Sequence, residues 1–295
     1  AFAKRQLPMT VGAEASAEVA AIGPGVSGLK TGDLVAIYGA PTCGVCRPCR
    51  EGRDNHCENP KGVHGFHLDG YAQELANMPA RNVVRAPEGL SDVAAAVAPV
   101  TFGTCEHMLF DNAKLESGET VLIHAGGSGI GSAAIQLAKK IGCTVITTVG
   151  SDDKIERCKE LGADHVINYN TEAWTSRARK ITKKKGVDVV FEHVGKDTWA
   201  GSMMVLRRGG RLVTCGSTSG VSAETNLMML FQQQLRLIGS FGCNMRNLTD
   251  AMEKMAHGIV HPVIDTELEF GELGPALERM EGRKVFGKII MRIND

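Results

Sequence analysis

The sequence predicts an α/β protein of two domains, a doubly wound parallel sheet and a separate, mostly β domain. From Thr120 onward, short β-rich runs alternate with amphipathic helical stretches, which is the pattern of a parallel sheet with helices on both faces. Before about residue 100, glycine and proline are frequent and β-like segments such as Ala17–Ile22 and Leu34–Ile37 are short. With 295 residues, the chain is long enough for two ordinary cores.

The hydrophobic pattern assigns the elements in order. Six strands are predicted in the sheet domain: Val121–His124, Thr144–Thr148, His165–Ile167, Asp188–Glu192, Leu212–Cys215 and Leu235–Gly239. The helix after the first strand carries one apolar stripe, which should face the sheet. After Phe241 the pattern predicts a helix, an extended stretch, a second helix and a last strand, at Leu248–His257, Val263–Phe270, Gly274–Glu281 and Lys288–Arg292.

Composition argues against nucleic acid and membranes as partners. Lys plus Arg and Asp plus Glu are both 33, so no global charge attracts a polyanion. The basic run Lys183–Lys185 is expected to be solvated surface. The longest apolar stretch, Val93–Val100, contains Pro99 and is too short to span a bilayer. Five cysteines are scattered along the chain as expected of free thiols, so we expect a cytoplasmic protein.

Four further cysteines fall close together in a loop rich in glycine and proline. They are Cys43, Cys46, Cys49 and Cys57, and their Cys-x2-Cys-x2-Cys-x7-Cys spacing brings four thiolates within reach of one tetrahedral ion. Four sulfur ligands close the coordination sphere, so we predict one structural zinc that takes no part in chemistry. The alternative is a loop that is merely cysteine-rich or paired in disulfides.

A glycine-rich turn follows the first strand of the sheet domain. The segment VLIHAGGSGIGSAAIQLAKKIG is a strand, a turn and a helix in succession, the context of a dinucleotide-binding site. We expect Gly126 to permit the tight turn, Gly129 to let backbone approach the pyrophosphate and Gly131 to let the helix pack closely. Ser128 stands where the strict fingerprint has its middle glycine. The helix N-terminus then presents N–H groups to the phosphates.

The end of the second strand predicts which nicotinamide cofactor binds. An acidic side chain there would accept the ribose hydroxyls of NAD and repel a 2′-phosphate. The strand instead runs into Gly150, Ser151 and Lys154, whose N–H groups, hydroxyl and ammonium suit a phosphate, so we predict NADPH. The alternative is that Asp152 or Asp153 takes the acidic role. We place both in the first turn of the next helix, with Ser151 as its N-cap.

With these features, the chain resembles the medium-chain dehydrogenase/reductase superfamily, which includes zinc alcohol dehydrogenases and quinone oxidoreductases. The likeness covers essentially the whole chain. Besides the cysteine loop and the glycine turn it includes GDLVAIY (Gly32–Tyr38), LDGYAQE (Leu68–Glu74), LGADHVINY (Leu161–Tyr169), GVDVVFEHVG (Gly186–Gly195), GGRLVTCGSTSG (Gly209–Gly220) and FGKII (Phe286–Ile290).

The resemblance implies three segments and an oligomer. A GroES-like catalytic domain would cover residues 1–100, with the zinc lobe at 41–60. A Rossmann NADP(H)-binding domain would cover 101–243, and residues 244–295 would return to the catalytic domain. The chain begins at Ala1 without an initiator methionine, so we expect the first strands of the catalytic domain to lie upstream. A homodimer or homotetramer is implied, with Leu235–Gly239 pairing across the dimer.

The chain departs from this resemblance at the catalytic zinc. Zinc alcohol dehydrogenases hold that ion through an upstream Cys, the His of a Gly-His-Glu motif, and a Cys or Asp shortly before the Rossmann domain. Here Ala13 replaces the histidine and the third position falls at Val100. Neither side chain has a lone pair to donate. We therefore predict no catalytic zinc, and we treat His64 and His67 as solvated loop residues.

Carried over residue by residue, the resemblance implies cofactor contacts but assigns no catalytic side chain. The contacts are Gly126, Ser128, Gly129, Ile130 and Gly131 at the pyrophosphate; Gly150, Ser151, Lys154 and Tyr169 at the adenosine 2′-phosphate; His193, Val194, Gly216, Ser217 and Thr218 along the carboxyl edge of the sheet; and Thr104, Phe241 and Gly242 near the nicotinamide. We expect His193 to stack or hydrogen-bond beside the cofactor ribose rather than to act as a general acid.

The missing zinc ligands decide between reactions. Reduction of a simple carbonyl needs strong stabilisation of the developing alkoxide, whereas a conjugated acceptor spreads its charge into an enolate. The leading hypothesis is an NADPH-dependent oxidoreductase that reduces polarised carbon–carbon double bonds or quinones of small molecules. One alternative is a zinc-dependent alcohol dehydrogenase with an altered or lost catalytic zinc site. The other is a non-catalytic NADPH-binding protein.

Overall fold

The chain divides into two units in a computed structural model that describes residues 7–293. Unit 1 comprises residues 1–104 and 242–295, and unit 2 comprises residues 105–241. Unit 2 is therefore one continuous stretch of chain inserted between the two segments of unit 1. Each unit is described below by itself.

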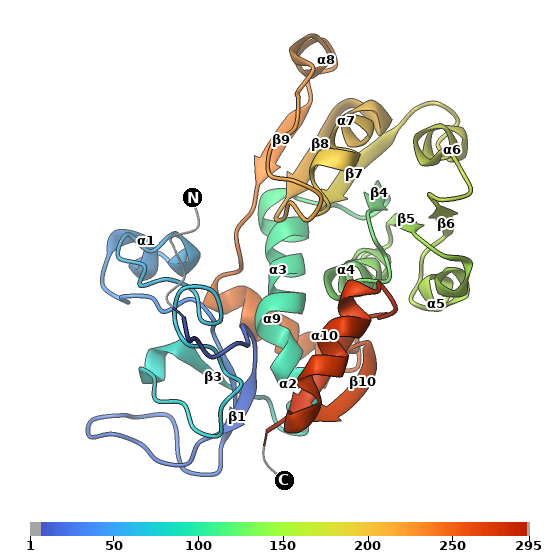
Figure 1. Cartoon of the computed structure of the whole chain (residues 1–295). Helices are drawn as coiled ribbons and strands as arrows, with labels where there is room; N and C mark the ends of the chain where they lie inside the picture. Colours follow the sequence, from blue (N-terminus) through green and yellow to red (C-terminus); the bar gives the residue numbers. More distant parts are fainter. Residues whose placement is uncertain (1–6, 294–295) are drawn as a thin grey trace. The chain divides into compact units, whose positions relative to one another are not determined.

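Unit 2 is built on a six-stranded parallel sheet (Figure 1). The strands lie in the order β6-β5-β4-β7-β8-β9. They are β4 (Thr120–Ile123), β5 (Thr144–Val149), β6 (His165–Asn168), β7 (Val187–Glu192), β8 (Leu206–Thr214) and β9 (Arg236–Gly239). The order reverses between β4 and β7, and ligands of doubly wound sheets bind at the carboxyl ends of the strands beside such a reversal. The predicted fold class is confirmed.

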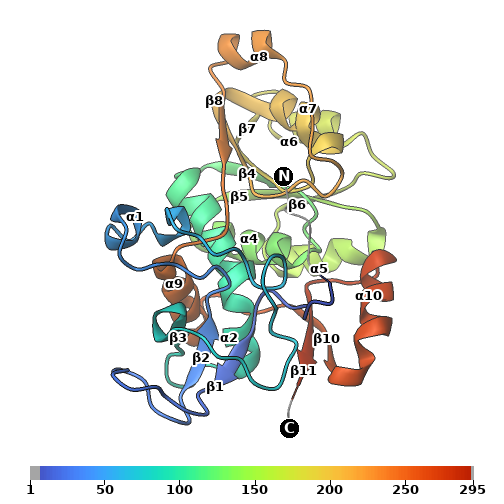
Figure 2. The same ribbon diagram turned by 60° about the vertical axis from the view of Figure 1, so that its left-hand side comes forward.

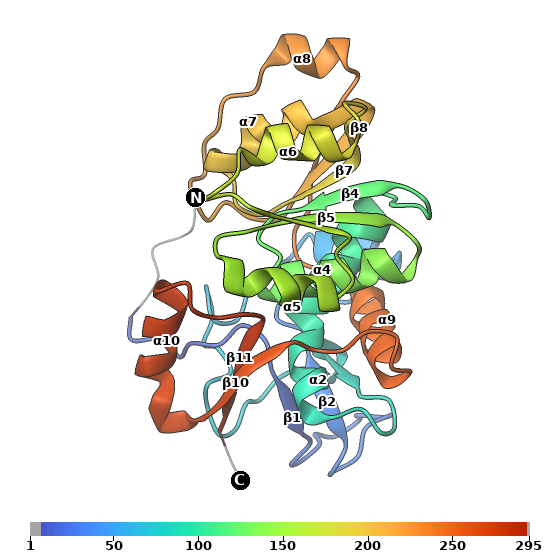
Figure 3. The same cartoon turned by 90° about the vertical axis from the view of Figure 1, so that its right-hand side faces the viewer.

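Helices cover both faces of this sheet (Figure 3). One face carries α4 (Gly129–Lys140) and α5 (Ile155–Glu160), the latter preceded by the 3-10 turn η5 (Asp152–Lys154); the other carries α6 (Trp174–Ile181) and α7 (Lys196–Val205), and α8 (Leu227–Gln232) precedes β9. The predicted apolar stripe of α4 is buried at Ala133, Ala134 and Leu137. Beneath the helices, Leu122, Ile146 and other strand residues lose all contact with solvent. This buried packing holds the strands in place, and with them the carboxyl ends of the strands, where the candidate site lies.

Unit 1 has two small sheets (Figure 2). An antiparallel sheet has the order β1-β2-β3, and β10 pairs in parallel with β11. The strands are β1 (Ser16–Glu18), β2 (Leu34–Ile37), β3 (Val83–Arg85), β10 (Ile264–Glu269) and β11 (Lys288–Arg292). The helices are α1 (Arg47–Arg50), α2 (Asp92–Val97), α9 (Met245–Ala256) and α10 (Leu273–Glu281), with 3-10 turns η1 (Asp54–His56), η2 (Ala80–Asn82) and η6 (Phe270–Glu272).

A long helical run begins in α2 and passes through Pro99. It continues as η3 (Ala98–Phe102), α3 (Gly103–Glu106) and η4 (His107–Asn112), with π-helical turns in η3 and η4. Proline lacks an N–H, and the wider turn of η3 accommodates it. The prediction that Pro99 leaves the apolar stretch too short to cross a bilayer is therefore wrong. Length and composition alone would allow Asp92–Asn112 to do so, but 78% of its window is buried in the structure, as in a core helix, so this is weak evidence for a membrane span.

Two strand boundaries differ from the prediction. Strand β1 ends at Glu18, well before the end of the predicted strand Ala17–Ile22. Strand β8 starts at Leu206, earlier than the predicted Leu212–Cys215, and its register against β7 shifts. Gly209 lies in β8 with φ +75, a conformation that only glycine adopts easily, so the strand continues through an irregularity that looks like a turn in the sequence.

Candidate cofactor and metal sites

The turn between β4 and α4 depends on two glycines for space. Ala125 has the left-handed φ of +48, so the turn conformation comes from this residue and not from Gly126 as predicted. A Cβ on Gly126 would lie 2.4 Å from Thr147 Oγ1 on β5, and a Cβ on Gly131 would lie 2.2 Å from the Ala125 carbonyl oxygen. A side chain at Gly126 would therefore push the turn away from β5, and one at Gly131 would push α4 away from the turn.

Ser128 is the N-cap of α4, which explains its departure from the strict glycine fingerprint. Its Oγ accepts a hydrogen bond from the Gly131 N–H at 3.0 Å. The N–H groups of Gly129 and Ile130 lie in the first turn, where no intrahelical carbonyl can accept from them. These groups and the helix dipole form a site for an anion such as a pyrophosphate.

The carboxyl end of β5 brings together residues predicted to bind a 2′-phosphate. A Cβ on Gly150 would lie 2.4 Å from the Tyr169 hydroxyl oxygen, so only glycine lets the ring lie there. The Asn170 side chain donates to the Gly150 carbonyl at 2.7 Å and holds the two loops together. Ser151 is the N-cap of η5, as predicted, but its side chain makes no capping bond, and Lys154 ends the same turn.

The nearby carboxylates lie where the sequence predicted them, in the first turn of η5. The Asn168 side chain donates to Asp152 Oδ1 at 2.7 Å. This bond ties the Asp152 carboxylate to the end of β6. One oxygen of one of the two candidate carboxylates therefore already accepts a hydrogen bond from the protein.

The loops after β7 and β8 interlock. The Thr218 hydroxyl donates to the His193 carbonyl at 3.3 Å, and the Ser219 N–H donates to the Val194 carbonyl at 2.7 Å. A Cβ on Gly216 would lie 2.9 Å from the His193 carbonyl oxygen. Ser217 packs closely against the loop after β7, because a Cβ on Gly195 would lie 2.8 Å from the Ser217 Cα. The structure thus brings together the five predicted residues of these loops.

His193 is buried and its protons are fixed by a backbone contact. Its Nε2 lies 2.8 Å from the His124 carbonyl oxygen, which can only accept, so Nε2 carries a proton. Burial lowers the pKa of His193, and the ring is neutral at neutral pH. A neutral imidazole held in this way positions its loop and is a poor general acid. The predicted contact with the cofactor ribose stays a prediction.

Sequence reasoning missed a buried carboxylate at the end of β7. Glu192 has no solvent exposure and accepts hydrogen bonds from the N–H groups of Val194 at 2.7 Å and Gly195 at 3.0 Å. The hydroxyls of Thr198 and Ser202 donate to it at 2.8 and 2.7 Å. An acidic residue closing the apolar run VDVVFE is the signal that could have found it.

A hydrogen-bonded chain leads from this carboxylate to the neighbouring strands. Ser202 gives its one proton to Glu192, so His124 Nε2, 2.9 Å away, must donate to Ser202 Oγ. His124 Nδ1 then accepts from the Thr148 hydroxyl at 3.2 Å. The Ala125 N–H donates to Thr148 Oγ1, also at 3.2 Å. This series of hydrogen bonds joins the ends of β4, β5 and β7.

The protonation states follow from burial and from this chain. Burial lowers the pKa of His124 to about 4, although Glu192 opposes the shift. Burial alone would raise the pKa of Glu192, but His124 and the hydrogen bonds from Ser202, Gly195 and Thr198 lower it below its usual value. At neutral pH the pair is a neutral imidazole and a hydrogen-bonded carboxylate rather than a salt bridge.

Three predicted residues lie where the chain passes between units. Thr104 ends the first segment of unit 1, Phe241 ends unit 2, and Gly242 begins the second segment of unit 1. Thr104 is buried, whereas Phe241 is 67% exposed. Their approach to the nicotinamide stays a prediction.

In unit 1 the four loop cysteines form a cluster suited to zinc. Their sulfur atoms all lie within 4.8 Å of one another, and a tetrahedral site with Zn–S bonds of about 2.3 Å has sulfur–sulfur edges of roughly 3.8 Å. Backbone N–H groups of Val45 and Cys46 lower the pKa of Cys43 to about 6. The N–H of Cys43 donates to Cys57 Sγ at 3.3 Å. These N–H groups favour the thiolate of Cys43, the form that binds a metal, whereas burial raises the pKa of Cys49 to about 12.

The cluster loop is anchored to the rest of unit 1. The buried Asp54 accepts from the Met245 N–H, in the first turn of α9, at 3.1 Å. Arg81 donates to the Thr42 carbonyl at 2.8 Å, just before the first cysteine. The cysteine loop is thereby connected both to residues that precede unit 2 in the sequence and to residues that follow it.

The region of Ala13 has no second cluster of this kind. Among residues 7–293, the four cysteines are the one group of three or more His, Cys, Asp or Glu side chains arranged to share an ion. The Glu14 carboxylate accepts from the N–H groups of Val100 at 3.2 Å and Thr101 at 3.1 Å and pairs with Lys288. Its oxygens are thus committed to the helical run just after Pro99 and to a cation.

Each of the two loop histidines, His64 and His67, has one ring nitrogen hydrogen-bonded to the backbone. His64 Nδ1 donates to the Asp69 carbonyl at 2.6 Å, and its ring lies 4.9 Å from that of Tyr71. His67 Nδ1 accepts from the Val63 N–H at 3.2 Å. These contacts account for both side chains as parts of the loop.

Comparison with known proteins agrees with this geometry. Residues 129–257 match the family of zinc-binding dehydrogenases, and residues 1–88 match the alcohol dehydrogenase GroES-like domain. The 2-haloacrylate reductase of a Burkholderia species is 30% identical over 300 residues, covering 96% of this chain and 81% of its own length. The chain belongs to the zinc-binding dehydrogenases of the medium-chain dehydrogenase/reductase superfamily. It is therefore an oxidoreductase.

Other members of this superfamily differ in their named activities. The acryloyl-coenzyme A reductase of Metallosphaera sedula is 28% identical, covering 98% of this chain and 85% of its own length. A crystal structure of an NAD-dependent alcohol dehydrogenase superimposes with a TM-score of 0.92 at 35% identity, covering 99% of this chain and 84% of that one. The superfamily assignment therefore leaves both the acceptor and the cofactor to be argued from the site.

We expect this zinc-binding dehydrogenase to hold one zinc per chain at the cysteine cluster. Cys46→Ser should lose the metal and lower the Tm, because the binding free energy of structural zinc is part of the folding free energy. Elemental analysis and thermal unfolding test this. Cys215→Ser removes a thiol outside the cluster and should keep a full equivalent of zinc. A full equivalent retained by Cys46→Ser would contradict the assignment.

We also expect stability to fall as the pH decreases from about 6.5 to about 4. The folded-state pKa of His124 is depressed, so the unfolded chain binds the proton first and the stabilisation present above pH 6.5 is lost on acidification. The loss should reach about 3 kcal/mol, with His193 adding to it. Urea unfolding should show a smaller pH slope for His124→Gln than for the exposed-site control His165→Gln. Equal pH slopes for the two variants would contradict the assignment of this loss of stability to His124.

Proposed function

We propose that the protein is an NADPH-dependent reductase of polarised carbon–carbon double bonds in small conjugated acids or thioesters. The observation that carries the proposal is the state of the region where zinc alcohol dehydrogenases bind their catalytic ion. Ala13 and Val100 offer no ligand atom there, and Glu14 is bound to backbone N–H groups and Lys288. This donor set does not fit a catalytic zinc.

Without such a Lewis acid, the acceptor must stabilise its own developing charge. In a conjugated acid, thioester or quinone, that charge is delocalised over an enolate, and hydrogen bonds from protein and water suffice. The 2-haloacrylate and acryloyl-coenzyme A reductases named above both act, by their names, on double bonds conjugated to a carboxyl group. Their similarity supports this acceptor class over simple carbonyls.

The residues around β5 support NADPH over NADH. Asp152 is held by Asn168, the Tyr169 hydroxyl lies against Gly150, and the next residue, Ser151, carries a second hydroxyl. Lys154 adds a cation that suits a phosphate. The pyrophosphate would lie on the first turn of α4, and the interlocked loops after β7 and β8 would fix the nicotinamide end. When bound, NADPH supplies the hydride.

A second candidate is an alcohol dehydrogenase whose catalytic metal site is altered. The structural similarity to an NAD-dependent alcohol dehydrogenase favours it. The third, a non-catalytic NADPH-binding protein, predicts cofactor binding without turnover. All three share the cofactor edge and differ in the acceptor, so turnover of defined acceptors separates them.

NADPH oxidation should be measured with acrylate thioesters, 2-haloacrylate and quinones beside simple aldehydes and ketones. We expect turnover confined to the conjugated acceptors and resistant to a chelator that leaves the structural zinc in place. Chelator-sensitive turnover of simple carbonyls would instead indicate the alcohol dehydrogenase. Cofactor binding with no turnover of any acceptor would favour the non-catalytic protein.

Lys154→Gln should reduce the preference for NADPH. Loss of one charge-assisted hydrogen bond to the 2′-phosphate should raise the Kd for NADPH about tenfold and leave the Kd for NADH unchanged. Lys140→Gln removes an equal charge from the far end of α4 and should change neither constant. The assignment of Lys154 fails if both cofactors weaken equally.

A further inference from the structure

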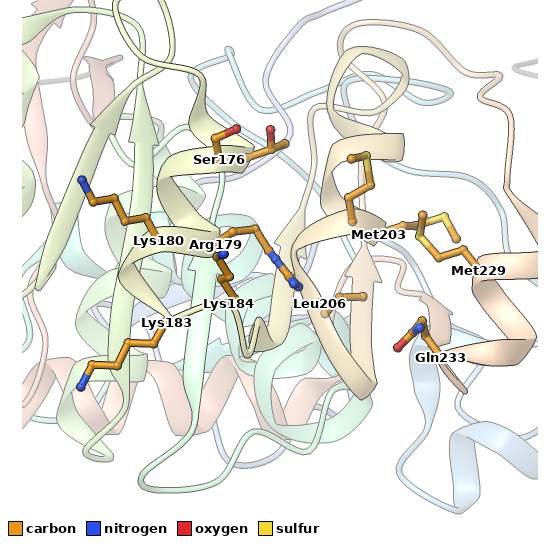
Figure 4. Close-up of a pocket in the computed structure, with 11 residues that line it drawn as sticks. Ser176, Arg179, Lys180, Lys183, Lys184, Met203, Leu206, Met229 and Gln233 are labelled. Carbon is orange, nitrogen blue, oxygen red and sulfur yellow. The ribbon is translucent and has the colours of Figure 1, made fainter.

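Unit 2 contains a hollow of about 940 Å³ (Figure 4). It lies between α6, α7 and α8. Basic residues and methionines dominate its lining. The lining residues are Thr175, Ser176, Arg179, Lys180, Lys183, Lys184, Met203, Met204, Leu206, Met229 and Gln233. Its volume is that of an ordinary small-molecule pocket.

The basic end of this hollow lies at the edge of the sheet opposite to the cofactor. Lys183 and Lys184 shortly precede β7, Leu206 is the first residue of β8, and Gln233 shortly precedes β9. These strands are parallel, so their amino ends share one edge. The glycine turn and the loops carrying His193 and Gly216 follow the carboxyl ends. A ligand at the basic end therefore cannot be the part of the cofactor held by those loops.

The charges in the hollow are uncompensated. None of the eleven lining residues is acidic, and in the described part of the chain Arg179, Lys180, Lys183 and Lys184 form no ion pair. Figure 4 shows Arg179 extending toward Leu206 with Lys184 beside it, whereas Lys180 and Lys183 extend outward. Two adjacent like charges repel each other, and a bound anion removes that cost.

The opposite wall of the hollow is apolar and adaptable. Met203, Met204 and Met229 come from α7 and α8, and Figure 4 shows Met203 and Met229 across from Arg179. Unbranched thioether side chains adjust to irregular apolar ligands. Met204 is 54% exposed, so part of this wall is open to solvent. A ligand that fills the hollow thus meets cations on one side and apolar surface on the other.

The backbone at the basic end is strained. Lys183 and Lys184 both have left-handed φ values, of +50 and +66, although neither is glycine. The turn is closed by bonds from the Lys184 N–H to the Arg179 carbonyl at 2.7 Å and from the Lys183 N–H to the Lys180 carbonyl at 3.0 Å. Glycine would adopt these angles without strain, so lysine costs stability here and contributes a charge.

We propose that this hollow binds an amphipathic anion, a molecule with a phosphate or carboxylate head and an apolar body. The head lies between Arg179 and Lys184, and the body lies against the methionines of α7 and α8. The site goes beyond the reductase activity, because it lies on the amino edge of the sheet. It also changes the expectation for Lys183–Lys185: the first two line a pocket, and only Lys185 lies outside it.

Anilinonaphthalene sulfonate, an aromatic sulfonate whose fluorescence rises in apolar surroundings, is a direct probe. It is titrated into full-length protein saturated with NADP+, so that the cofactor site is filled. Arg179→Gln combined with Lys184→Gln should raise the Kd at least tenfold, since two charge-assisted hydrogen bonds are lost. Lys185→Gln, a neutralisation in the same run, should leave the Kd within twofold. Equal Kd values for the double variant and Lys185→Gln would overturn the proposal.

Two further variants separate binding from folding. Lys184→Gly should relieve the left-handed strain, so the Tm should not fall, yet the probe should bind more weakly. Met204→Gln should weaken binding, whereas Met228→Gln, at a similarly exposed position outside the hollow, should not. Undiminished binding to both Lys184→Gly and Met204→Gln would overturn the proposal.

Competition then identifies the source of the anion. Displacement by dodecyl phosphate supports a lipid-like ligand, and displacement by coenzyme A supports a nucleotide-bearing one. Inorganic phosphate at the same concentration should not displace the probe, because it lacks the apolar body. Displacement by inorganic phosphate alone, or by none of the three, would overturn the proposal.

Discussion

The carboxyl edge of the sheet in unit 2, where we propose that the cofactor binds, depends on one buried carboxylate, that of Glu192. Its two oxygens accept from two backbone N–H groups and two hydroxyls, so the cost of burying a charge is offset by four donors. The N–H donors belong to Val194 and Gly195, in the loop that interlocks with the loop after β8. Replacing the charge with a neutral group would leave these donors in a buried site without an adequate acceptor.

The same carboxylate sets the direction of a longer chain of bonds. Because Ser202 donates to Glu192, His124 must donate to Ser202 and accept from Thr148, which fixes one neutral tautomer of the buried imidazole. Thr148 in turn receives the N–H of Ala125, the left-handed residue of the glycine turn. The glycine turn, the end of β5 and the loop after β7 are thus joined by one continuous network, and such networks are stronger than their separate bonds.

The sequence predicted the features whose signals lie within a short stretch of chain, and it missed contacts between residues far apart in the sequence. The four cysteines, the strands and the glycine turn are visible because their signals lie within a few residues of one another. His124 and Ser202 lie 78 residues apart, and nothing in either neighbourhood predicts their bond. Ala125 as the turn residue, the passage of a helix through Pro99 and the continuation of β8 through Gly209 were also missed. In each of these, tertiary packing outweighs a local preference that points the other way.

The most direct test is to measure NADPH affinity and backbone amide exchange in Glu192→Gln, a variant of nearly the same shape. If the carboxylate organises the cofactor edge, the Kd for NADPH rises at least tenfold in protein that remains folded, and the amides of Val194 and Gly195 exchange faster. Ser117→Ala, the loss of an exposed hydroxyl just before the amino end of β4, serves as the control and should change neither quantity. A folded Glu192→Gln protein with wild-type affinity and unchanged exchange at both amides would contradict the account.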